Sequence, residues 1–199
     1  MLNRLSRAFR AWAAPTLAAL TGFGCAQSAP QTPALTQTWK DSSMHTITVK
    51  TLEGADTSLS QYAGKVTLVV NVASQCGLTG QYAGLQRVYD KYRDRGLVVL
   101  GFPSGDFGSQ EFNDANEIRD FCTAKYSVTF PLFEKCGVVA GPTQSKVFEC
   151  LGTKTGELPG WNFGKYVVSR DGRTAKFFTS TTDPEGSALA QAIEAALAQ

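Results

Sequence analysis

The chain has 199 residues, of which 43% are hydrophobic and 18% charged, enough for one domain with a sizeable core and an appended segment. The formal net charge is only +2 at pH 7, a low and balanced value that gives no indication of nucleic-acid binding. Five cysteines, an odd number, argue against a simple disulfide framework, and a core of this size does not need one.

Residues 1–26 have the composition of a secretory signal peptide. Arg4, Arg7 and Arg10 supply positive charge without an acidic residue, and small, mostly apolar residues follow. This stretch is too short and too weakly apolar for a transmembrane helix. Cys25 leaves open a lipid-anchored protein acylated at that residue, although the residues before it match such a site poorly. We predict export to the periplasm or the extracellular space, where a reactive thiol requires a dedicated reductant.

Residues 27–42 are rich in Gln, Thr, Pro and Ala, a composition typical of a flexible tether. The folded domain is predicted over residues 43–199, and Thr46–Val49 alternates like a half-exposed strand near its start. The single histidine, His45, lies far upstream in a polar stretch. A nucleophilic pair of cysteine and histidine is therefore not predicted.

The run Val66–Val72 is the strongest structural signal. It is apolar, β-branched and almost uninterrupted, as expected of a strand buried on both faces of a parallel sheet. Apolar residues recur at intervals of three and four over Thr79–Arg93, which predicts an amphipathic helix. Cys76 lies between them and precedes Gly77. Unpaired N–H groups at a helix N-terminus stabilise a thiolate nucleophile, but an ordinary buried cysteine explains this stretch equally well.

A second buried strand is predicted at Leu97–Phe102, because Arg95–Gly96 stops the preceding helix and Pro103 ends the pairing. The order strand, helix, strand predicts a right-handed parallel crossover. A Gly-rich loop over residues 104–111 follows. Since ligands of parallel sheets bind beyond the carboxyl ends of the strands, we expect this loop and Cys76 to be neighbours.

The rest of the chain continues the alternation of helices and strands. The predicted elements are a helix at Asn113–Lys125, a brief helix at Ser145–Leu151, hairpin strands at Lys165–Ser169 and Thr174–Phe178, and a closing helix at Glu185–Ala198. Asp183–Pro184 is expected to cap the closing helix. The predicted fold class is α/β and thioredoxin-like, with a central mixed β-sheet flanked by helices.

Four separate segments resemble the glutathione peroxidases, in the order and context of that family. They are Asn71–Thr79, Gly101–Pro103, Phe107–Glu111 and Trp161–Phe163. Each lies at a predicted strand end or in a loop, and the resemblance covers about residues 44–195. It implies a thiol peroxidase that reduces hydrogen peroxide and organic or lipid hydroperoxides.

By this resemblance Cys76 is the peroxidatic residue, and Gln110, Trp161 and Asn162 complete the catalytic site. A peroxide needs a thiolate to attack one oxygen and stabilisation of the departing oxygen, and the sulfur becomes a sulfenic acid. Amide and indole N–H groups can hold the thiolate without competing to be protonated. Taken singly, each has a plainer interpretation, as a core tryptophan, a solvated glutamine or a turn asparagine.

The segment Phe121–Tyr126 resembles the part of thioredoxin-dependent members that carries a resolving cysteine. By that match Cys122 attacks the Cys76 sulfenic acid and forms an intramolecular disulfide. The two α-carbons must then come within ~7 Å, by local unravelling of the helix if they start far apart. The alternative is that Cys122 only packs on its helix. Cys136 and Cys150 have no assigned role, and without a Cys-x-x-Cys pair neither a metal site nor a bound cofactor is predicted.

The sequence departs from the family pattern in three places. Gly105–Asp106 stands where Asn–Gln is usual, and we expect Asp106 to point away from a thiolate that it would repel. Phe112 stands where proline often follows. The connection from Phe133 to Trp161 is short and lacks the insertion that tetrameric members use for assembly. The resemblance therefore implies a monomer with an open site, which suits bulky hydroperoxides.

The reductant is predicted to be a thioredoxin-like dithiol protein. Glutathione is less favoured, because the sequence shows no arginine cluster that would hold its carboxylates. Two other functions stay open on the same fold. One is a thiol–disulfide oxidoreductase, against which the absence of Cys-x-x-Cys counts. The other is a redox sensor that passes the oxidation of Cys76 to a partner.

Overall fold

The computed structural model describes residues 39–199, so the predicted signal peptide at 1–26 and most of the tether at 27–42 lie outside the described residues. The elements are the strands β1 (Thr48–Lys50), β2 (Asp56–Ser58), β3 (Val66–Val72), β4 (Leu97–Pro103), β5 (Lys165–Val168) and β6 (Ala175–Phe178), the helices α2 (Gln81–Tyr92), α3 (Ala115–Tyr126), α4 (Lys146–Thr155) and α5 (Ser187–Leu197), and 3₁₀-helices at Met44–Thr46, Leu59–Tyr62 and Arg93–Arg95. At the end of the tether, the Lys154 ammonium of α4 bonds the carbonyl oxygens of Trp39 (3.0 Å) and Ser42 (2.6 Å).

The main sheet has four strands in the order β4-β3-β5-β6, and β1 pairs with β2 in a separate sheet. Strand β3 runs parallel to β4, from Val66 opposite Leu97 to Val72 opposite Pro103, and antiparallel to β5 on its other side. The predictions of a parallel crossover and of a mixed sheet are confirmed. The two long parallel strands end at the same edge, which places the turn after β3 beside the loop after β4.

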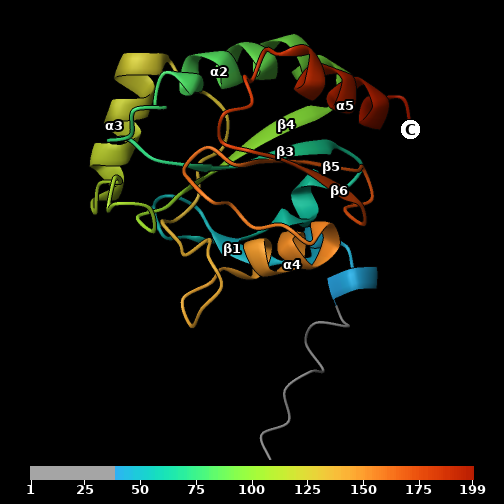
Figure 1. Ribbon diagram of the computed structural model, residues 1–199, viewed down its shortest axis with the longest axis horizontal. Coiled ribbons are helices and arrows are strands. Elements are labelled where there is room, and N and C mark those ends of the chain that lie inside the picture. The colour runs from blue at the N-terminus through green and yellow to red at the C-terminus, as the bar shows by residue number, and fades with distance from the viewer. Residues whose placement is uncertain (1–38) are drawn as a thin grey trace, which may run out of the picture. The chain divides into compact units, whose positions relative to one another are not determined.

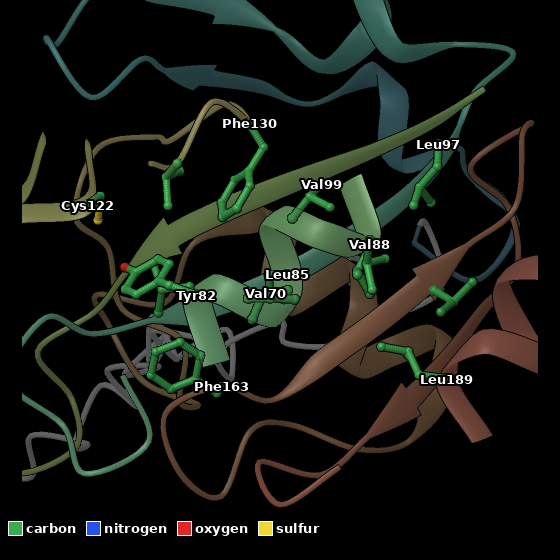
Figure 2. Close-up of a cluster of buried hydrophobic side chains, with 14 of the residues drawn as sticks. Val70, Tyr82, Leu85, Val88, Leu97, Val99, Cys122, Phe130, Phe163 and Leu189 are labelled. Carbon is green, nitrogen blue, oxygen red and sulfur yellow. The ribbon is translucent and has the colours of Figure 1, made fainter. Parts of the chain in front are cut away.

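Helices cover both faces of this sheet, with α2 and α5 on one face and α4 on the other (Figure 1). Every residue of β3 and of β4 is buried. Leu68 and Val70 belong to the core under α2 and α5, part of which Figure 2 shows, whereas Val69 belongs to the core against α4. This explains the uninterrupted apolar run, because side chains that alternate between faces meet a core on each side.

The helix boundaries differ from the sequence prediction where polar side chains engage the backbone before a helix. Helix α2 begins at Gln81 rather than Thr79, because the Thr79 hydroxyl folds back onto the carbonyl oxygens of Cys76 and Ala73. The prediction that Asp183–Pro184 caps the closing helix is wrong. Helix α5 begins at Ser187 with Gly186 as its N-cap and has no side-chain cap.

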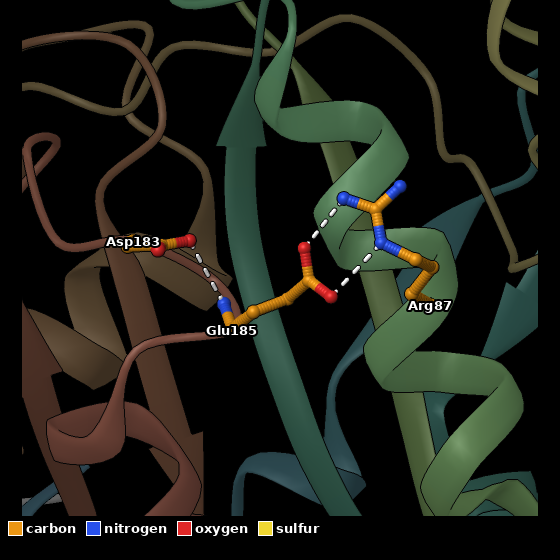
Figure 3. A network of polar contacts seen from close by, with 3 residues as sticks. All are labelled: Arg87, Asp183 and Glu185. Atoms are coloured by element: carbon orange, nitrogen blue, oxygen red, sulfur yellow. Dashed lines mark hydrogen bonds and ion pairs between the residues drawn. The ribbon is translucent and has the colours of Figure 1, made fainter.

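Asp183 instead builds the turn that precedes α5. Its side chain accepts a hydrogen bond from the Glu185 amide at 3.0 Å, and its carbonyl oxygen accepts one from the Gly186 amide at 3.0 Å. The Glu185 carboxylate then pairs with Arg87 of α2, so this turn fastens the two helices on one face of the sheet (Figure 3). The pair is exposed and adds little to stability by itself.

His45 is 3% exposed, and its ring lies against Gly172 in the turn between β5 and β6. Neither ring nitrogen has a hydrogen-bond partner within residues 39–199. Burial lowers the pKa of His45, and the nearby Asp171 carboxylate opposes this effect only partly. The histidine therefore belongs to the packing of the N-terminal segment against the turn between β5 and β6.

We expect the free energy of unfolding to fall as the solution is acidified through the titration of His45. Its pKa is lower in the folded state, so the unfolded chain takes up the proton first, and stability present above about pH 6.5 is lost towards the lower folded pKa. Urea denaturation at about pH 7 and about pH 5 measures this loss. In His45→Gln the loss should shrink, and an unchanged pH dependence would contradict the assignment.

Candidate active site

Cys76 lies in the turn that joins β3 to α2 and is 9% exposed. The Cys76 amide donates to Thr79 Oγ1 at 3.1 Å, and the Leu78 amide donates to Cys76 Sγ at 3.4 Å. A backbone N–H aimed at sulfur stabilises negative charge on it. A side chain built on Gly77 would meet no atom within 4 Å, so the backbone next to the sulfur is open to a reacting molecule. Such a turn can present a thiolate to a small substrate.

The loop after β4 is joined to this turn by hydrogen bonds from two successive amides. The Ser74 amide donates to Glu111 Oε1 at 3.1 Å, and the Gln75 amide donates to the Gln110 carbonyl oxygen at 2.9 Å. The expectation that the Gly-rich loop and Cys76 are neighbours is thus confirmed. The backbone of Gln110 is thus bonded to the residue that directly precedes Cys76.

Asn162 and Trp161 reach the same loop from the turn before β5. Asn162 is buried and donates through Nδ2 to Gln110 Oε1 at 3.1 Å. The Trp161 indole is 40% exposed, and its ring lies 5.6 Å from the Phe107 ring, centroid to centroid. The structure therefore brings Gln110, Asn162 and Trp161 together at the edge that holds Cys76. Among the described residues, the hydrogen bond to Sγ comes from the Leu78 amide, and none of these three side chains donates to it.

The turn that carries Trp161 is held by two residues that sequence reasoning missed. Asn71 of β3 donates through Nδ2 to the Trp161 carbonyl oxygen at 3.1 Å and accepts from the Phe163 amide at 2.7 Å. The buried Lys165 ammonium donates to the Phe163 carbonyl oxygen at 2.7 Å, and burial lowers the pKa of Lys165 to about 8. These bonds fix Phe163 at a positive φ of 68°. The polar Asn71 within an apolar strand was the available signal.

Asp106 points away from the thiol, as expected. Its carboxylate accepts hydrogen bonds from the amides of Val138 (2.6 Å) and Val139 (3.1 Å), in the segment that follows Lys135. The negative charge that replaces the usual family residue is therefore neutralised by backbone dipoles of another loop.

Cys122 lies on α3 and is completely buried. The pKa of the Cys122 thiol is raised to about 11, mainly by burial, with the Tyr82 hydroxyl opposing the rise and the Glu111 carboxylate adding to it. The Tyr82 hydroxyl points towards this thiol without forming a hydrogen bond of good geometry (Figure 2). Cys76 and Cys122 belong to the same core cluster but are not bonded to each other. Both thiols are free in this structure.

The remaining thiols of the described chain are Cys136 and Cys150, both unpaired. Burial raises the pKa of Cys136 to about 12 and that of Cys150 to about 11, so neither of them, like Cys122, is an activated nucleophile in its buried position. Within residues 39–199, no group of three or more His, Cys, Asp or Glu side chains is arranged to hold a metal ion. In the same range, no helix is both long and apolar enough to cross a membrane.

The fold is that of the thioredoxin-like class of thiol oxidoreductases, and Cys76 follows a central strand of its mixed sheet. Solved structures support this class. The chain superposes on Trgpx in its apo form with a TM-score of 0.64 and 35% identity, over 79% of this chain and 97% of that one. T. cruzi GPX1 has the same fold, with a TM-score of 0.61 and 24% identity over 78% of this chain and 97% of that one.

The family model described as glutathione peroxidase matches residues 44–152. A hydroperoxy fatty acid reductase of Synechocystis sp. is 44% identical over 147 residues, which cover 67% of this chain and 85% of that protein. A glutathione peroxidase of Lactococcus lactis is 41% identical over 138 residues, 67% of this chain and 87% of that protein. The chain belongs to the glutathione peroxidase family. It is a peroxidase that acts on a peroxide with a thiol as the reductant, as the resemblance implied.

Proposed function

We propose that Cys76 is the peroxidatic residue and that the substrates are hydrogen peroxide and organic or lipid hydroperoxides. The thiolate of Cys76 attacks one peroxide oxygen, the O–O bond breaks, and the departing alkoxide or hydroxide takes up a proton. The cysteine is left as a sulfenic acid. The observation that carries this proposal is the Leu78 amide, which donates to Cys76 Sγ at 3.4 Å in a turn bordered by two donor-bearing loops.

Gln110, Trp161 and Asn162 are proposed to stabilise the thiolate and the leaving oxygen. The bond from Asn162 to Gln110 uses the side-chain carbonyl oxygen of the glutamine. The NH₂ group of Gln110 is therefore left to donate towards the reacting atoms. The Trp161 indole N–H can serve in the same way, because its ring stands half-exposed over the loop that contains Phe107.

The bulkier substrates are favoured by the apolar surface of this site. Trp161 is one of two large apolar side chains within residues 39–199 that are exposed, and it lies against the half-buried Phe107 ring. An acyl or aryl group can lose water-exposed area there while the peroxide group enters the turn. The name of the Synechocystis relative, a hydroperoxy fatty acid reductase, agrees with this choice.

Cys122 is proposed to resolve the sulfenic acid. Its thiol attacks the Cys76 sulfur, water leaves, and an intramolecular disulfide forms. The resolving step needs α3 to open locally, and α3 is weakly anchored, with Ile118 and Cys122 as its buried residues. Helix α2 buries six residues by comparison. A helix with few buried contacts can open at a modest cost in free energy.

The finer details of the cycle are also proposals. A thioredoxin-like dithiol protein is the proposed reductant of the disulfide, and glutathione is the second candidate. The protein is proposed to work as a monomer without a bound cofactor and to be exported to the periplasm or the extracellular space. Acylation of Cys25 would make it lipid-anchored instead of soluble.

Mass spectrometry of the mature protein after one equivalent of peroxide tests the proposal. We expect a chain that begins near residue 27 without a lipid, has lost two hydrogens, and yields a crosslinked peptide pair that contains Cys76 and Cys122. A disulfide to Cys136, or a persistent sulfenic acid, would contradict the resolving role. With a thioredoxin system as the reductant, turnover should be at least about tenfold faster than with glutathione.

Two outcomes would identify the alternative functions. Reduction of a disulfide substrate without any peroxide indicates a thiol–disulfide oxidoreductase. A single oxidation of Cys76 followed by transfer of the disulfide to one protein target indicates a redox sensor. Continuous peroxide consumption with a dithiol protein excludes both as the main activity.

A further inference from the structure

Glu111 is a buried carboxyl group at the point where the two site loops meet. It is 3% exposed, and its Oε1 accepts hydrogen bonds from the Ser74 amide (3.1 Å) and the Phe112 amide (2.9 Å). The Gln75 amide also donates to the Gln110 carbonyl oxygen, so Ser74 and Gln75 of the cysteine turn are both bonded to the loop of Gln110 and Glu111. Gln75 directly precedes Cys76.

The same loop is also held from its backbone side. The Lys135 ammonium donates to the carbonyl oxygens of Glu111 and Phe112, both at 3.2 Å, and to Asn113 Oδ1 at 2.9 Å. These bonds leave the Glu111 side chain directed at the cysteine turn. The Lys135 ammonium therefore holds the backbone of the Gln110 loop. The Glu111 side chain joins this loop to Ser74 in the turn before Cys76.

A buried carboxyl group at this position costs more free energy of desolvation than an apolar side chain that would fill the same space. Burial raises the pKa of Glu111, against the effect of the amides that bond it. Its Oε2 is buried without a hydrogen-bond partner in the described chain, as are the hydroxyl groups of Ser74 and Tyr82. Unsatisfied buried polar atoms are rare and costly. The hydrogen bond from the Ser74 amide to Oε1, which fixes the cysteine turn, offsets this cost in free energy.

We propose that Glu111 is a positioning residue for the peroxide reaction, whose Oε1 fixes the turn of Ser74 to Cys76 against the loop of Gln110. This role rests on the proposed function of Cys76. It keeps Sγ, the Leu78 amide and the Gln110 side chain in one arrangement while the peroxide oxygen is transferred. A shift of reacting groups by about 1 Å can cost up to ~100-fold in rate, so a short rigid link has a large effect.

Two conservative variants separate position from charge. Glu111→Gln keeps the length of the side chain and an acceptor oxygen for the Ser74 and Phe112 amides, but removes the negative charge. Glu111→Asp keeps the charge but withdraws the oxygen by one methylene. We expect the second-order rate constant for Cys76 oxidation by hydrogen peroxide to stay within about twofold in Glu111→Gln and to fall at least about tenfold in Glu111→Asp.

The controls are Glu117→Gln and Glu117→Asp, the same changes at an exposed residue of α3, which should leave the rate unchanged. Urea denaturation of each variant shows which fraction is folded, and the rate is expressed per folded molecule. A Gln variant that is no faster than the Asp variant overturns the proposal, as does an Asp variant with the wild-type rate. If wild-type Cys76 does not react with peroxide, the proposed function fails instead.

Discussion

Cys76→Ser is expected to lower the rate of peroxide consumption by at least about a thousandfold. Serine keeps the size of the side chain in the turn and the hydrogen bond from the Cys76 backbone amide to Thr79. Its hydroxyl is almost wholly protonated at neutral pH and does not form the oxidised sulfur species on which the cycle depends. Stopped-flow measurement of peroxide loss with a dithiol reductant in excess checks this result.

Cys150→Ser is the matched control for this experiment. Cys150 is another buried, unpaired thiol, but it lies on α4 in the core on the opposite face of the sheet. We expect this variant to keep most of the activity if it remains folded, since no hydrogen bond links Cys150 to the cysteine turn in the described residues and its thiol is buried in the other core. Activity in Cys76→Ser above a few per cent of wild type would place the attacking thiol elsewhere in the chain.

Cys122→Ser is expected to separate the two halves of the cycle. The first oxidation of Cys76 should proceed within about twofold of the wild-type rate, because the Cys122 thiol takes no part in the attack on peroxide. Turnover with a dithiol protein should fall by about a hundredfold or more, because no intramolecular disulfide forms. A sulfenic acid should then accumulate on Cys76, where a carbon nucleophile such as dimedone can trap it.

The serine introduced at this position has a partner available, since the Tyr82 hydroxyl points towards Cys122 and has no good hydrogen bond of its own (Figure 2). The variant should therefore fold. Cys136→Ser is the comparison, with turnover expected to match wild type. Unchanged turnover in Cys122→Ser would remove the resolving role and leave this cysteine as a packing residue.

The central strands were predictable because their pattern is local. Strand β3 occupies the predicted residues 66–72, and β4 extends the predicted run by one residue to Pro103. Both are buried on two faces, which is why nearly all of their side chains are apolar. The prediction of where α5 begins was wrong because local chemistry was not enough. Asp183–Pro184 has the local chemistry of a helix cap, but Asp183 satisfies the turn before the helix.

The candidate site was predictable only in part. The resemblance to the family was enough to select Cys76, Gln110, Trp161 and Asn162, and the topology was enough to expect the Cys76 turn and the Gln110 loop at one edge of the sheet. The supporting residues depend on contacts between distant parts of the chain. Glu111 reaches Ser74 across 37 residues, and Asn71 reaches Trp161 across 90. No spacing or composition shows such contacts before the chain folds.

The burial of two titratable side chains, Lys165 and His45, could not be predicted from the sequence either. Lys165 begins a predicted strand and could have pointed to solvent, yet its ammonium is enclosed and holds the Phe163 carbonyl oxygen. His45 lies in a polar stretch but is covered by the turn at Gly172. In both cases a neighbouring strand or turn decides the exposure of the side chain. For His45 this turn comes more than a hundred residues later in the chain.

The position of Trp161 has a practical consequence. The chain contains three tryptophans, and one of them is this half-exposed indole, in the turn whose Asn162 bonds the Gln110 loop next to Cys76. Indole emission depends on nearby dipoles and on contact with water. If Cys76 is the peroxidatic residue, as proposed, we expect the emission of unlabelled protein to change when this cysteine is oxidised.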